Sequence, residues 1–311
     1  MRAQFSSATF FNRYPHIFQA AQQIAARDLP TDRPLRILSF GCSIGEEILS
    51  LRLHFPDAEI FGCDINQTVL ASGAEIFRQA DATAFLSTHA AIRDHGPFDI
   101  ITAMSVLCRH PVGDIANTFP FSAFEDHLGP LDQSLSDHGL LIVYNASYLF
   151  RGTVLATRYR PLRADSIGSN GFVTRHGRAS DPLAHFVYSD LDTTYRVECP
   201  DRIRFEDFID CIHQKCPAGH STDPEYVKIR SSLDGQKTKE IFTWSRKGVL
   251  NGLTAELPVD LMDTHIDMRL IEVLDAGPGG SGAQRYLEKS SSRRDIWRQG
   301  YRGRARFLMA V

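Results

Sequence analysis

Two glycines, two glutamates and an aspartate stand close together near the N-terminus of this chain, in the segment LRILSFGCSIGEEILSLRLHFPDAEIFGCDIN at 35–66. Gly41 and Gly45 allow the backbone to approach a ligand where a Cβ would clash. The free N–H groups of the following helix face the same crevice. Asp64 lies about 20 residues beyond Gly45, where nucleotide-binding folds place a carboxylate that binds ribose hydroxyls. A ligand-free glycine turn, common in α/β proteins, is the simpler alternative.

The spacing around the turn indicates which ligand it would suit. A dinucleotide fold needs G-x-G-x-x-G, whereas Gly41 and Gly45 are followed here by Glu46 and Glu47. Two carboxylates at a helix start would repel a pyrophosphate. They suit a ligand that carries a cation, such as the amino group or sulfonium of S-adenosylmethionine (SAM). The alternative is that acids in a first turn simply stabilise the helix through its dipole.

GCSIGEEILSL resembles the motif of chemotaxis receptor methyltransferases, SAM-dependent enzymes that esterify glutamate side chains and whose glycine turn runs into G-E-E. A second stretch, SSATFFNR at 6–13, looks like the N-E-T-x-F-F-R stretch of that family. The resemblance implies that Thr9 and Arg13 bind SAM, Arg13 through the methionine carboxylate. Glu46 would then bind the cationic end and Asp64 the ribose. A helix cap and a solvated arginine are the alternative for the N-terminal pair.

The same resemblance implies further cofactor contacts at Cys42, Ser43, Ile65, Ser105 and Val106. It covers roughly residues 5 to 145 and departs from the family pattern in two places. The C-R-N triplet of the fourth strand is replaced by Ala-Met-Ser at 103–105, and the family's preceding helical domain is absent from the short segment ahead of the first strand. The match therefore favours SAM binding more than it favours a receptor glutamate as substrate.

Alternating apolar runs and helical patterns predict an α/β fold, a Rossmann-like, doubly wound and mostly parallel sheet with a C-terminal extension. Strands are expected at 36–40, 59–63, 83–86, 98–104 and 139–144, and helices at 18–27, 46–55, 67–79 and 124–136. Ligands of such sheets bind beyond the carboxyl ends of the strands, where Gly41, Asp64 and Ser105 all fall.

Four regions are expected: a cofactor-covering helical segment at 1–34, the SAM-binding core at 35–150, an insertion with a closing hairpin at 151–250, and a partly flexible extension at 251–311. The hairpin is predicted from apolar runs at 226–229 and 240–245 around Asp-Gly. A helix is predicted at 205–215.

The insertion is expected to cover the methyl acceptor between Phe150 and Asp223. Its arginines favour an anionic acceptor, unless they form a solvated basic loop; they are Arg158, Arg160, Arg163, Arg175 and Arg178. His110, just after the fourth strand, is the candidate general base, with a surface histidine as the alternative. Tyr144 and Asn145 end the fifth strand and are candidates to line the acceptor pocket.

A Cys/His cluster comprises Cys211, His213, Cys216 and His220. The spacing is not that of structural zinc sites, which place two close ligands, a loop and then two more. On the predicted helix the side chains would also point to different faces. No metal is therefore expected.

Composition narrows the function classes. The 311 residues are 43% hydrophobic with a formal charge of −3, which provides no basic field for nucleic acid. No apolar run approaches the ~20 residues of a membrane span, and no signal peptide is recognisable, so a cytoplasmic protein is expected. Six scattered cysteines indicate reduced thiols.

The sequence thus predicts a SAM-dependent methyltransferase that modifies oxygen or nitrogen of a small molecule, and leaves the acceptor and the oligomeric state open. A protein-carboxylate methyltransferase is one alternative. A non-catalytic SAM-binding regulatory module is another. A nicotinamide-dependent oxidoreductase is a third, which the glycine spacing disfavours.

Overall fold

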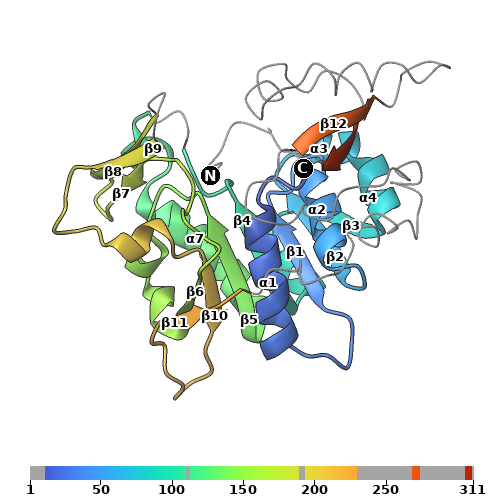
Figure 1. The fold of residues 1–311 in the computed structure, drawn as a ribbon, viewed down its shortest axis with the longest axis horizontal. Helices are drawn as coiled ribbons and strands as arrows, with labels where there is room; N and C mark the ends of the chain where they lie inside the picture. The colour runs from blue at the N-terminus through green and yellow to red at the C-terminus, as the bar shows by residue number, and fades with distance from the viewer. Residues whose placement is uncertain (1–10, 110–112, 189–192, 230–267, 274–304, 310–311) are drawn as a thin grey trace. The chain divides into compact units, whose positions relative to one another are not determined.

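The central element is an eight-stranded sheet (Figure 1). The computed structural model describes residues 11–109, 113–188, 193–229, 268–273 and 305–309. Along the sheet the strands run β11 (Glu225–Val227), β6 (Tyr159–Ala164), β10 (Ile212–Lys215), β5 (Leu135–Tyr144), β4 (Phe98–Met104), β1 (Arg36–Phe40), β2 (Glu59–Asp64) and β3 (Ala82–Leu86).

Strands β1 to β5 are mutually parallel, with β1 paired to both β2 and β4. The predicted doubly wound α/β sheet is therefore confirmed. The strand order reverses between β1 and β4, and this is the switch point at which such sheets bind ligands. All seven residues of β4 are buried, as expected for a strand covered on both faces.

Helices cover both faces of the sheet. On one face α1 (Pro15–Asp28), α2 (Glu46–His54) and α4 (Ala74–Ala80) pack over residues such as Ile37 and Ile100. On the other, α5 (His89–His95) and α7 (Phe121–Gln133) pack over Leu38 and Ile101. Because alternate residues of a strand point to opposite faces, the all-apolar strands supply both cores. None of the helices in the described ranges combines the length and the apolar character of a membrane-spanning segment.

The helix predicted at 67–79 is two helices, α3 (Gln67–Ser72) and α4, with a break at Gly73. A Cβ at Gly73 would lie 2.2 Å from the carbonyl oxygen of Ile44, in the glycine turn. Because Gly73 has no side chain, its backbone packs directly against the backbone of Ile44, and this contact supports the glycine turn.

The antiparallel edge of the sheet differs from the prediction. Residues 205–215 are not a helix but a short 3₁₀ turn, η3 (Phe205–Phe208), followed by β10, which pairs antiparallel with β5 and β6. The closing antiparallel strand is therefore β10. Residues 240–245, the second strand of the predicted hairpin, lie outside the described residues. The first predicted strand, 226–229, overlaps β11, which pairs parallel with β6.

Two 3₁₀ turns, η1 (Phe150–Gly152) and η2 (Val154–Arg158), follow β5. A small antiparallel sheet of β7 (Arg175–His176), β8 (Pro182–Tyr188) and β9 (Thr193–Val197) comes between β6 and η3. A short α6 (Ile115–Thr118) precedes α7. The chain divides into two compact units after Ile229. In the second unit, β12 (Met268–Val273) pairs antiparallel with β13 (Ala305–Met309).

Candidate active site

The glycine turn joins β1 to α2 and is held by the end of β2. Gly41 and Gly45 have φ of 75° and 97°, which other residues adopt only with strain. A Cβ on Gly41 would lie 2.2 Å from Cγ2 of Val106, and one on Gly45 would lie 3.1 Å from Ile76. The protein's own packing therefore requires both glycines, a reason that the sequence pattern did not reveal.

Asp64 ties this turn to the end of β2. Its Oδ2 accepts a hydrogen bond from the backbone N–H of Ser43 at 3.1 Å, and its Oδ1 accepts one from the N–H of Asn66 at 2.8 Å. Ile65 is 58% exposed beside it. The structure thus brings Ser43, Asp64 and Ile65 together at the carboxyl ends of β1 and β2. The Cys42 side chain is buried and points towards Gly62 in the core.

The two glutamates of α2 were expected to face a ligand together, but the structure holds them differently. Oε1 of Glu47 accepts hydrogen bonds from the hydroxyls of Ser39 in β1, at 2.8 Å, and Thr102 in β4, at 2.6 Å. Desolvation raises the pKa of Glu47, and these two hydrogen bonds oppose the rise. Glu47 therefore joins the helix to the two strands of the switch point. Glu46 is 4% exposed in the first turn.

Residues 11–14, here called the N-terminal strap, run from α2 to the ends of β4 and β5. The backbone N–H of Asn12 donates to Oγ of Ser50 at 2.7 Å, and its Oδ1 lies 3.1 Å from Nε2 of His54. The Tyr14 hydroxyl lies 3.0 Å from Oγ of Ser105. Both ends of the strap are therefore fixed, one on either side of the switch point.

Arg13 lies between these two anchors. Its guanidinium is 4.9 Å from the centroid of the Tyr14 ring. Burial raises the pKa of Tyr14 to about 12, and the positive charge of Arg13 opposes that rise. The same charge acts on Glu47, so Arg13 is near the strand ends around Ser43, Asp64 and Ser105, a region here called the crevice. The other resemblance-based residue of this segment, Thr9, and the candidate base His110 lie outside the described residues.

Ser105 and Asn145 end β4 and β5, and both have a φ of 58°. The Asn145 amide donates to Oγ of Ser105 at 2.9 Å. Its Oδ1 accepts hydrogen bonds from the backbone N–H groups of Phe172 and Val173, at 2.6 and 3.0 Å. Asn145 thus connects the crevice to the loop of the insertion, a role that the sequence did not indicate.

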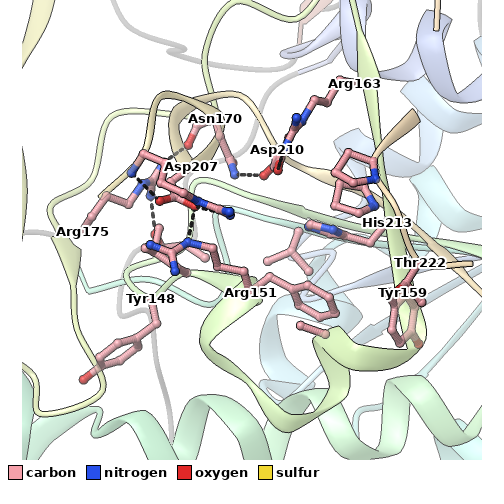
Figure 2. Close-up of a pocket in the computed structure, with 18 of the residues that line it drawn as sticks. Tyr148, Arg151, Tyr159, Arg163, Asn170, Arg175, Asp207, Asp210, His213 and Thr222 are labelled. Carbon is pink, nitrogen blue, oxygen red and sulfur yellow. Dashed lines mark hydrogen bonds and ion pairs between the residues drawn. The ribbon is translucent and has the colours of Figure 1, made fainter. Parts of the chain in front are cut away.

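A cavity of about 290 Å³ lies beyond β5, on the face that carries α7 (Figure 2). It is bounded by β6, β10, η1, η2 and the loop before β7. Its charged lining consists of two ion pairs, Arg151–Asp207 at 2.5 Å and Arg163–Asp210 at 2.8 Å, together with Arg175 and Arg204. Val143, Ala146 and Phe150 form an apolar part of the lining.

The arginines predicted to recognise an anion do not act as one group. Arg158 pairs with Asp132 at 2.8 Å, and Arg160 pairs with Glu225 at 3.0 Å. Arg178 lies over the ring of Phe121 at 5.1 Å. Arg163 and Arg175 do line the cavity, as does Arg151, which the sequence analysis did not single out.

The Cys/His cluster is spread over a strand and a loop rather than a helix. His213 is buried in β10 and stacks on Phe150, with 4.2 Å between ring centroids. Cys216 directs its thiol to the carbonyl of Ser221 at 3.4 Å, and the His220 ring lies 5.8 Å from that of His138. Within the described ranges, no three His, Cys, Asp or Glu side chains are grouped as a metal site.

Comparison with known proteins gives likenesses of fold. No family model and no curated protein matches the chain. A SAM-dependent methyltransferase of Clostridium acetobutylicum aligns at 12% identity over 57% of this chain and 58% of its own, with a TM-score of 0.33.

Two further solved structures align over smaller shares. The plantazolicin methyltransferase bound to S-adenosylhomocysteine aligns at 19% identity over 42% and 46%, with a TM-score of 0.30. The CurJ carbon methyltransferase aligns at 21% identity over 42% and 34%, with a TM-score of 0.34. The present chain spans less than two thirds of each of these three proteins.

Proposed function

We propose that this protein is a SAM-dependent methyltransferase that acts on a small molecule. The observation that carries the proposal is the convergence, at one switch point, of the Ser43–Asp64 pair and the strap that ends in the Tyr14–Ser105 pair. Together they surround the strand ends where doubly wound sheets bind nucleosides.

In this proposal the ribose hydroxyls bind Asp64, and the exposed side chain of Ile65 offers an apolar surface for the adenine. Arg13 binds the methionine carboxylate, and the backbone from Gly41 to Gly45 follows the amino-acid part of the cofactor. Glu46 stands at the helix start for the cationic end. Val106 contributes through Gly41, against which it packs.

Methyl transfer from a sulfonium is an in-line displacement, so the protein contributes mainly alignment and exclusion of water, together worth up to about 7–11 kcal/mol. Tyr14, with its pKa raised to about 12, stays protonated at neutral pH. It therefore serves as a hydrogen-bonding group rather than a base. If the acceptor is a hydroxyl or ammonium, a base is required, and His110 remains our candidate for it.

Calorimetry with SAM and S-adenosylhomocysteine tests the cofactor assignment. Both should bind in the micromolar range, and Asp64→Asn should weaken both by about 1–3 kcal/mol, because the ribose hydroxyls lose a charged acceptor. Asp94→Asn, on an exposed position of α5, is the matched control. Unchanged affinity in Asp64→Asn would refute the assignment of that residue. Binding of NAD(H) instead of SAM would overturn the proposal.

Turnover separates an enzyme from a binding module. The protein should transfer labelled methyl from SAM to a component of a small-molecule extract, identified by mass spectrometry. If SAM binds but no methyl group is transferred, either to a small molecule or to a protein carboxylate, the non-catalytic module would be favoured.

A further inference from the structure

Arg175 is a buried cation that has no counter-ion in the part of the chain that the structure describes. Its side chain is 1% exposed, and its Nη groups donate to the carbonyl oxygens of Ala146 and Asn170 and to the Tyr195 hydroxyl. Among the described residues no carboxylate pairs with it, and its Nε finds no hydrogen-bond partner. A buried charge without a counter-ion is costly even when it is hydrogen-bonded, so a compensating anion is expected nearby.

His213 is the second unpartnered group around the same cavity. It is 3% exposed, and in the described part of the chain neither ring nitrogen has a hydrogen-bond partner. Burial lowers its pKa to about 3. The ring is therefore neutral at physiological pH, with one donor and one acceptor to offer. Leaving such buried groups unpaired is costly, so a ligand that pairs with them would be favoured.

Apart from Arg175, the charged residues of the cavity lie in ion pairs with two aspartates. Arg151 pairs with Asp207, and Arg163 pairs with Asp210. Arg204, half exposed, also approaches Asp207 at 3.6 Å. The lining thus carries four arginines and two aspartates, an excess of positive charge. Figure 2 shows Arg175 and His213 approaching the cavity from opposite sides, with Arg151 between them.

We propose that this cavity binds a small organic anion with an apolar body. Arg175, assisted by Arg151, would hold the anionic group, a carboxylate or a phosphate ester. The apolar body would lie against Val143 and Phe150, and a hydroxyl or carbonyl of the ligand would pair with His213. This inference goes beyond the proposed function, because it requires neither SAM nor methyl transfer.

Calorimetry and thermal shift with defined probes test it on the full chain. The probes are benzoate, 4-hydroxybenzoate and phenyl phosphate, with benzamide as the uncharged analogue of benzoate. At least one anion should saturate with a Kd of about 1 mM or lower, and benzamide should bind at least about tenfold more weakly. Failure of all three anions to saturate below about 10 mM, or equal binding of benzoate and benzamide, would overturn the proposal.

Two variants locate the site. His213→Phe keeps the stacking on Phe150 and removes both ring nitrogens, so it should fold and weaken 4-hydroxybenzoate by about five- to tenfold. Arg160→Gln, which lies outside the cavity lining, should leave affinity unchanged. The reverse pattern, or no effect of His213→Phe, would place the anion elsewhere. SAM affinity, measured on the same samples, should not change in either variant, so a failure here is distinct from a failure of the proposed function.

Discussion

The crevice at the switch point and the cavity beyond β5 hold their polar groups in opposite ways. Around the crevice, side chains such as Glu47, Asp64 and Tyr14 are hydrogen-bonded within the protein. Around the cavity, Arg175 and His213 keep buried atoms that have no partner in the described structure. The first region is built around a backbone turn whose polar groups are satisfied, whereas in our proposal the side-chain groups of the second are satisfied by a ligand. The comparison predicts that substitutions in the crevice cost stability, whereas some in the cavity increase it.

Gly41→Ala should have the largest effect. A Cβ there meets Val106 and a left-handed backbone, so we expect a loss of about 2–5 kcal/mol in the free energy of unfolding. Gly129→Ala is the control, since a Cβ at that position in α7 meets nothing within 4 Å. It should stabilise by up to about 1 kcal/mol. Urea denaturation measures both, and equal stability of the two variants would contradict this view of the turn.

Two buried histidines give the sharpest form of the comparison. His54→Phe removes the ring nitrogen that lies 3.1 Å from Oδ1 of Asn12 and should lower the free energy of unfolding by about 1–3 kcal/mol, because this buried polar contact is lost. His213→Phe removes two ring nitrogens that have no partner among the described residues, and it should raise the free energy of unfolding by a similar amount. Chemical denaturation at about pH 7.5 measures the free energy of unfolding of both variants. A loss of stability in both variants would show that His213 has a partner after all.

The same histidines predict acid sensitivity. Burial lowers the pKa of His54 to about 4 and that of His213 to about 3, below their unfolded value. Between those values and about pH 6.5 the unfolded chain binds protons that the folded chain does not. Stability is therefore full above about pH 6.5 and falls as the pH decreases, by about 1 kcal/mol per pH unit for each histidine.

A denaturation series from about pH 7 to pH 5 measures this slope. His213→Phe should reduce the slope by the share of one histidine, whereas Arg160→Gln should leave it unchanged. An identical slope in wild type and His213→Phe would mean that this histidine titrates normally in the fold.

Tyr14→Phe should have the smallest effect. It removes the hydroxyl that reaches Ser105 and keeps the ring that packs on Tyr144. We expect SAM affinity to fall by about 0.5–1.5 kcal/mol, with the affinity of the cavity for anions unchanged. Calorimetry of both ligands checks this. A larger loss for the anion than for SAM would mean that the two regions are not separate.

The sequence predicted the N-terminal half of the sheet because local signals there agree with the fold. Apolar runs between turn residues mark β1, β2 and β4, and Asp64 follows β2 directly. Positions of residues at strand ends follow from the order of the sheet. What it did not reveal were long-range contacts, such as that of Val106 with Gly41 or of Tyr14 with Ser105, since neither depends on spacing along the chain.

The antiparallel edge was predicted wrongly for a physical reason. In residues 205–215 the apolar side chains Phe205, Phe208, Ile209 and Ile212 have helical spacing. Pairing with β5 and β6 overrides that local preference and makes β10 a strand. The sequence of β6, with Pro161 and several arginines, is likewise more typical of a loop than of a strand inside a sheet. The cavity could not be predicted because these two strands form its base.

Asn145 restricts how this protein can change over evolution. Its side chain donates a hydrogen bond to Ser105 through the amide nitrogen and, at the same time, accepts one from the loop at 170–173 through the amide oxygen. Aspartate would supply no such donor, and glutamine would be a methylene too long. A homologue that exchanges this insertion for another would therefore have to replace Asn145 as well. The half of the chain that contains the glycine turn and the insertion are thus expected to diverge together rather than as independent modules.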